Sequence, residues 1–193
     1  DPGVARAMAT LLLEQSGAAL YTDNNADNAF ALAARAHEIL EPYRTTDARA
    51  ARQHIAALQA QADSYGWKDR YAEALPMHQA AEAFAASLPE VLSSDIDVMR
   101  ARGSNLRLMG EAYHRLERVE EARVTLDRAV TQQRAVSEAA PNNPGFMRNL
   151  AIALWYRAVV HRSNDRNEAA RASIEESVTV ARRMRERDPN DAG

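Results

Sequence analysis

Residues 106–130, LRLMGEAYHRLERVEEARVTLDRAV, contain the pattern that decides the fold expected for this chain. On each side of a central turn, side chains follow the i, i+4, i+7 spacing that places them on one face of a helix. The first set is Leu106, Gly110 and Tyr113, and the second set is Ala122, Leu126 and Ala129. The stretch predicts a helix, a tight turn and a second helix, and we expect Gly110 and Ala122 to meet where the helices pack.

The same hairpin pattern recurs three more times, at offsets of 48 or 45 residues. In every unit, twelve residues separate the small residue of the first helix from the alanine that begins the second. The corresponding residues are Leu13, Gly17, Leu20, Ala29, Ala33 and Ala36; Leu58, Ala62, Tyr65, Ala74, His78 and Ala81; and Leu154, Ala158, His161, Ala170, Ile174 and Ser177. Because one such hairpin cannot bury its apolar face alone, the repetition predicts stacked hairpins.

The turns between paired helices also repeat. Asn24, Asp69 and Asp165 each lie five residues before the repeated alanine, and Glu117 departs from this rule in the third unit. Side chains of Asn and Asp accept hydrogen bonds from the free N–H groups at a helix start. We therefore expect Asn24, Asp69 and Asp165 to be N-caps of the second helices.

These patterns predict an all-α chain of eight antiparallel helices in four hairpins. The stretches between units match as well, since SEAAPNNPG at 137–145 is similar to RERDPNDAG at 185–193. The expected helices span residues 4–21, 28–43, 47–65, 70–88, 95–115, 118–139, 144–162 and 166–187. The expected units, about 4–43, 47–88, 95–139 and 144–187, form a single domain, 1–193.

In these residues the chain resembles the tetratricopeptide repeat (TPR) family, a helix–turn–helix with Leu, a small residue and Tyr on its first helix. The family carries Ala, an apolar residue and Ala on the second helix, and Pro near the end. The matching residues here are Leu106, Gly110, Tyr113, Ala122, Leu126, Ala129 and Pro141. The match covers about residues 10–189, although these units are longer than the usual ~34 residues and lack the usual first-helix aromatic.

The resemblance implies a right-handed α-solenoid. Long units with PNN or DPND junctions are also similar to the repeat arms of bacterial serine/threonine protein kinases and winged-helix regulators. No kinase or winged-helix segment is present in the sequence itself. The resemblance thus implies a repeat domain from a bacterial signalling or regulatory protein.

Composition excludes several classes of function. The 24 basic and 27 acidic residues give a net charge of −3, which argues against binding to nucleic acid. Without cysteine, the chain has no disulfide, thiolate zinc site or cysteine nucleophile. No apolar run approaches the ~18 residues of a membrane span, so we expect a soluble protein, with the cytoplasm favoured over the periplasm. The chain begins DPG without methionine, and we interpret it as a segment of something longer.

Catalytic and metal-binding motifs are not evident. No two of the five histidines are spaced i, i+4, none lies in an HExxH motif, and His78 and His161 occupy core positions of the repeat. The adjacent carboxylates of Glu120–Glu121 and Glu175–Glu176 point ~100° apart on a helix, which rules out a catalytic pair. We therefore expect no enzyme, no catalytic residue, no metal ion and no cofactor.

In the TPR family the first helices line a concave groove that binds a protein or peptide. In this chain the groove residues are expected one place beyond the core stripe. They are Glu14, Ala18, Gln59, Asp63, Arg107, Glu111, His114, Trp155, Val159 and Arg162. The first hypothesis is a non-catalytic scaffold, and two alternatives stay open. One is an arm that senses a small ligand or signal peptide and controls an attached kinase or DNA-binding domain, and the other is a self-assembly module.

The last helix carries an apolar stripe with no helix after it in the sequence. The stripe is expected to consist of Ile174, Val178, Ala181 and Met184. Repeat arrays need a polar outer face on their terminal units to remain soluble. We therefore expect a weak homodimer through this C-terminal helix.

Overall fold

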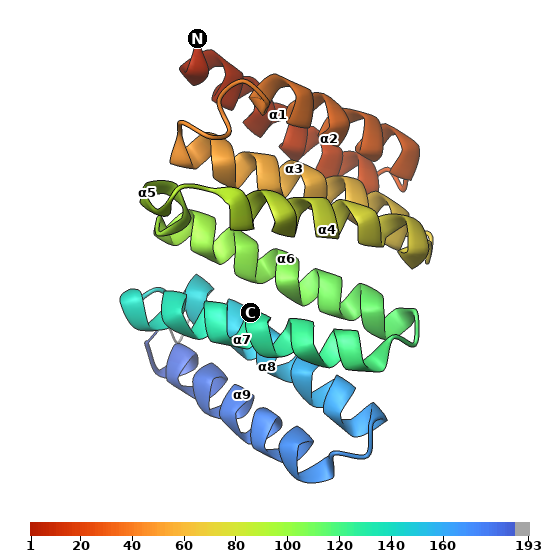
Figure 1. Cartoon of the computed structure of the whole chain (residues 1–193), viewed down its shortest axis with the longest axis vertical. Coiled ribbons are helices and arrows are strands. Elements are labelled where there is room, and N and C mark those ends of the chain that lie inside the picture. Colours follow the sequence, from red (N-terminus) through yellow and green to blue (C-terminus); the bar gives the residue numbers. More distant parts are fainter. Residues whose placement is uncertain (188–193) are drawn as a thin grey trace. The chain divides into compact units, whose positions relative to one another are not determined.

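The computed structural model describes residues 1–187, and this part of the chain is helical throughout (Figure 1). Within it, 84% of the residues lie in nine α helices and none in a β strand. The all-α prediction is thus confirmed for the described residues. The chain divides into two compact units, Asp1–Asn105 and Leu106–Gly193, which are described separately.

Neighbouring helices in the sequence pack against each other within each unit (Figure 1). The first unit contains α1 (Pro2–Tyr21), α2 (Ala26–Leu40), α3 (Ala48–Gly66), α4 (Tyr71–Ser87), α5 (Glu90–Ser93) and the start of α6 (Ile96–Arg115). The second contains the end of α6, then α7 (Val119–Ala139), α8 (Pro144–Ser163) and α9 (Asn167–Arg187). Eight of these helices match the expected ones to within a few residues. The junction proline at position 189 lies outside the described residues.

The ninth helix in this part of the chain, α5, lies where the sequence predicted only a break. Pro89 has φ −54°, and its carbonyl accepts hydrogen bonds from the N–H groups of Leu92 and Ser93, both at 2.9 Å. Leu92 is buried in the same core cluster as Val98, so packing holds this short turn in place. The expectation of eight helices is therefore wrong by one short element.

Each long hairpin turns on a residue in the left-handed region. The four residues and their φ angles are Asn24 (52°), Asp69 (55°), Glu117 (59°) and Asp165 (54°). They recur at the offsets of the sequence repeat, 45 and then 48 residues. Asn and Asp tolerate this conformation better than most residues, and Glu117 adopts it as well. The third hairpin, which contains Glu117, thus turns in the same way as the other three.

The expectation that these residues cap the second helices is wrong. The N-caps of α2, α4 and α7 are Asn25, Arg70 and Arg118, each one residue further on. The left-handed residue instead closes the end of the first helix. The N–H of the next residue donates to a carbonyl five positions earlier, as in Arg70 to Tyr65 (3.1 Å) and Arg118 to Tyr113 (2.9 Å). This arrangement is a Schellman motif.

The repeated small residues have different neighbours in different units. A Cβ atom added to Gly110 on α6 would lie 2.6 Å from Cγ of Leu126 on α7, which is fully buried. Gly110 therefore marks a close helix crossing, and Leu126 supplies the atoms nearest to it. A Cβ added to Gly17, the equivalent residue of the first repeat hairpin, would have nothing within 4 Å.

This contrast predicts opposite effects for the same substitution at two equivalent positions. Gly110→Ala should lower the free energy of unfolding by roughly 1–3 kcal/mol, because the new methyl group overpacks against Leu126. Gly17→Ala should raise it by up to about 1 kcal/mol, because alanine is the better helix former and space is free. Urea unfolding followed by circular dichroism measures both, and effects of the same sign would contradict the packing described.

Candidate functional site

The expected groove residues of the first unit are only partly available to a partner. Glu14 and Ala18 are exposed on α1, whereas Gln59 and Asp63 are half-buried on α3. Nε2 of Gln59 donates a hydrogen bond to the carbonyl of Ala101 on α6, at 3.0 Å. The Gln59 amide therefore helps to hold α3 against α6.

The expected residues on α6 pack against α8. Arg107, Glu111 and His114 are half-buried, and the Arg107 guanidinium lies 5.1 Å from the centre of the Tyr156 ring. The Tyr156 hydroxyl hydrogen-bonds with Glu111, and Nη1 of Arg107 lies 3.6 Å from Oε2 of the same carboxylate. Burial, and then the charge of Glu111, raise the pKa of Tyr156 above its ordinary value. This cluster joins two helices, so Arg107 and Glu111 are less free than the sequence suggested.

The expected residues on α8 lie together at an open cavity. Trp155 is 49% exposed, Val159 is half-buried and Arg162 is exposed. They face α9 across a cavity of about 630 Å³. Its lining consists of Trp155, Ala158, Val159, Arg162, Asn167, Ala170, Arg171, Ile174 and Glu175.

This cavity, here called the α8–α9 cavity, is lined by apolar side chains and by charged ones, the latter here called its rim. Trp155 and Ile174 are large apolar side chains that remain 49% and 39% exposed. On the rim, Nε of Arg171 donates to Oε1 of Glu175 at 2.7 Å, which neutralises that pair. An exposed tryptophan beside an arginine is typical of the anchor points of protein interfaces.

The apolar stripe expected on α9 mixes two faces of the helix. Ile174 and Val178 are exposed, whereas Met184 packs against the core cluster that contains Val180. The core-facing side of α9 is partly polar, since the Ser177 hydroxyl donates to the carbonyl of Ala151 at 2.9 Å. Because that face carries serine, the pattern of apolar residues alone did not indicate which side of α9 packs against α8.

The repeat offset relates the α8–α9 cavity to a covered surface in the preceding hairpin. Trp155, Val159 and Glu175 correspond to residues 48 positions earlier, which are Arg107, Glu111 and Asp127. In the second unit α8 covers those residues: Tyr156 contacts Arg107 and Glu111, and Nη1 of Arg157 lies 4.0 Å from Oδ1 of Asp127. By the repeat offset, the α8–α9 cavity is therefore equivalent to the surface that α8 covers in the preceding hairpin.

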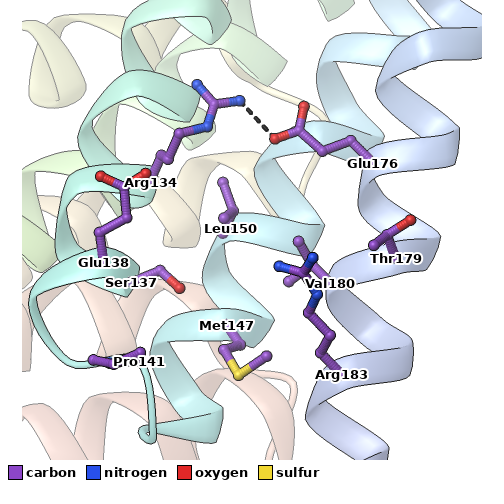
Figure 2. Close-up of a pocket in the computed structure, with 10 residues that line it drawn as sticks. All are labelled: Arg134, Ser137, Glu138, Pro141, Met147, Leu150, Glu176, Thr179, Val180 and Arg183. Carbon is purple, nitrogen blue, oxygen red and sulfur yellow. Dashed lines mark hydrogen bonds and ion pairs between the residues drawn. The ribbon is translucent and has the colours of Figure 1, made fainter.

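A second, smaller cavity of about 360 Å³ opens between α7, α8 and α9 (Figure 2). Met147, Leu150 and Val180 are its apolar residues. As Figure 2 shows, Arg134 of α7 reaches Glu176 of α9, and Nη2 of the arginine lies 2.6 Å from Oε1 of the carboxylate. Because this ion pair already satisfies both charges and ties the two helices together, we interpret the cavity as structural.

The histidines fall into different environments. His78, at its expected core position, is buried, and its Nδ1 lies 2.9 Å from Oδ1 of Asn105. His37, Glu41 and His54 form the one group within residues 1–187 whose side chains could hold a metal ion. The spacing of the histidines alone does not indicate this group. The i, i+4 spacing of His37 and Glu41 is the signal in the sequence that could have done so.

Comparison with known proteins adds no assignment. No family model matches the sequence, and no curated protein shows significant similarity to it. Among residues 1–187, no helix is both long enough and apolar enough to cross a lipid bilayer.

Buried histidines make the stability of the fold depend on pH. Desolvation by burial, and then the neighbouring His37 and Arg44, lower the pKa of His54 from 6.5 to about 3. Glu41 and the Phe84 ring are its other neighbours. The unfolded chain therefore binds a proton more readily, and stability present above pH 6.5 is lost as the pH falls toward 3.

We expect the free energy of unfolding to fall by about 2 kcal/mol through His54 alone between pH 6.5 and about pH 5. Urea titrations in chelator-treated buffer at several pH values measure this slope. His54→Gln should flatten it, because glutamine does not titrate. A slope that is unchanged in the variant would show that His54 is not the group responsible.

Proposed function

We propose that this chain is a non-catalytic, protein-binding repeat domain of TPR type, and that its α8–α9 cavity accepts an amphipathic helix of a protein partner. The observation that carries the proposal is the repeat offset, which relates the residues around the cavity to residues that α8 covers. The right-handed solenoid, built on eight principal helices in one domain, belongs to the same proposal. A role in a bacterial signalling protein and a cytoplasmic location are also part of this proposal.

The lining of the cavity indicates the chemistry of the partner. Trp155 and Ile174 require apolar side chains, which a helix presents at i, i+3 and i+4. Arg162 is exposed at the rim, and the Arg171 charge is balanced by Glu175. We therefore expect an amphipathic helix whose apolar stripe is flanked by an acidic residue facing Arg162.

Two other occupants follow from the same surface. At about 630 Å³ the cavity falls within the range of small-molecule sites, which supports a ligand-sensing arm. The exposed Ile174 and Val178 would also allow weak self-association through α9. A helix is the favoured occupant, because a helix, α8, covers the equivalent surface 48 residues earlier in the sequence.

A library of displayed amphipathic 20-residue helices, selected against the purified chain, tests the proposal. Binders should lose at least about tenfold in affinity with Trp155→Ala or Ile174→Glu, because anchor residues dominate such interfaces. Val124→Glu is the matched control, since Val124 is a similarly exposed apolar residue on α7. In a Trp67→Phe background, binding should shift the emission of the remaining tryptophan to shorter wavelength.

Several outcomes would contradict this assignment. Binders that lose affinity equally with Val124→Glu would show that the α8–α9 cavity has no special role. Saturable binding of small metabolites, blocked by Ile174→Glu, would favour the sensor. A mass that rises with concentration in light scattering, and falls to that of one chain with Val178→Glu, would favour self-assembly.

A further inference from the structure

The end of α2 and the middle of α3 bring two histidines and a carboxylate together. His37 lies in the last turn of α2, Glu41 is the C-cap residue of that helix, and His54 lies on α3. One possible ligand atom of each residue lies within 4.8 Å of those of the other two. The His37 and His54 rings are 4.3 Å apart between centroids, and Nδ1 of His54 lies 4.0 Å from Oε2 of Glu41.

The Nδ1 atoms of His37 and His54 lack the hydrogen bonds that buried polar atoms normally make. His54 is only 2% exposed, and its Nδ1 has no hydrogen-bond partner among the described residues. The same holds for Nδ1 of His37. Buried polar atoms without a partner call for an explanation, and one explanation is an ion that the atoms would bind. Nδ1 of the buried His78 has its partner in Asn105, whereas Nδ1 of His114 and of His161 also lack one, but neither of these belongs to a candidate metal-binding group in the described part of the chain.

We propose that His37, Glu41 and His54 bind a divalent transition-metal ion, with Zn²⁺ as the reference ion. Two imidazole nitrogens and one carboxylate oxygen form a ligand set that zinc accepts, with a fourth position left for water. The site lies in the first unit and the α8–α9 cavity in the second, so the inference goes beyond the proposed protein-binding function.

Arg44 and Phe84 hold the candidate ligands in position, although the positive charge of Arg44 opposes a bound cation. Nη2 of Arg44 lies 2.7 Å from Oε1 of Glu41, which orients the carboxylate and leaves Oε2 toward His54. The Arg44 guanidinium also lies over the ring of Phe84, and that ring packs against His54. Such contacts around the ligands fix their orientation.

The distances require only small side-chain movements. Ligand bonds of about 2.0–2.2 Å around a tetrahedral ion place the ligand atoms about 3.4 Å apart. The three atoms here, which lie up to 4.8 Å apart, therefore need to approach one another by as much as about 1.4 Å. Glu41 is exposed and can rotate, whereas His54 is fixed by the core. A bound ion would join the end of the first hairpin to the start of the second.

Isothermal titration of the untagged, chelator-treated chain with zinc chloride at pH 7.5 tests the proposal. We expect one ion per chain, and a midpoint of thermal unfolding that rises with zinc concentration. Glu41→Gln and His37→Gln should each weaken binding at least about tenfold. Glu41→Gln is the safer variant for folding, because the side chain is half exposed.

Two matched controls accompany these variants. Glu38→Gln changes an exposed carboxylate on the same helix, and His161→Gln changes a buried histidine in the second unit. Both should bind zinc as the parent chain does. The proposal is overturned if no saturable binding occurs, or if Glu41→Gln and His37→Gln bind as tightly as the controls. None of these results bears on the α8–α9 cavity, so the two proposals fail independently.

Discussion

The hydrogen bond that closes each first helix behind a left-handed residue is the constraint on which the remaining structure depends. It reverses the chain at Asp69, Glu117 and Asp165, and Asn24 makes a related turn. In every unit the next alanine follows five residues later and is buried in the core. Fixed spacing around the turn brings the apolar faces of the paired helices together. The difference between units of 45 and 48 residues therefore falls in the junctions, where length is free to vary.

Features that depend on local sequence patterns were predicted better than features that depend on contacts between distant residues. The spacing of Leu106, Gly110 and Tyr113 predicted a helix and its buried face, because helical periodicity is a property of the chain itself. The role of Asp69 was predicted wrongly, because Asp favours both helix starts and left-handed turns. Helix α5 depends on burial of Leu92, which no local pattern reveals. Its four residues are also too few for a periodic signal.

In the candidate sites, too, local sequence patterns predicted some residues, whereas contacts between helices determined the others. Trp155 and Arg162 were expected at a binding surface and do line the α8–α9 cavity, but its second wall depends on the register of α9. The approach of His54 to His37 joins two helices, so sequence spacing could not reveal it. Equivalent positions of the repeat thus acquire different roles from their neighbours: Leu126 is fully buried beneath Gly110, whereas Ile174 remains exposed.

The exposed side of the last hairpin also bears on how the chain moves. Helix α8 packs against both α7 and α9, whereas α9 rests on α8 and is joined to α7 by the Arg134–Glu176 ion pair. Local opening is easiest where an element has the fewest packing partners. Amide protons of α9 should therefore exchange with solvent sooner than those of α8. A helix that occupied the cavity would slow this exchange, so recognition would appear as a change in local dynamics even where the coordinates stay the same.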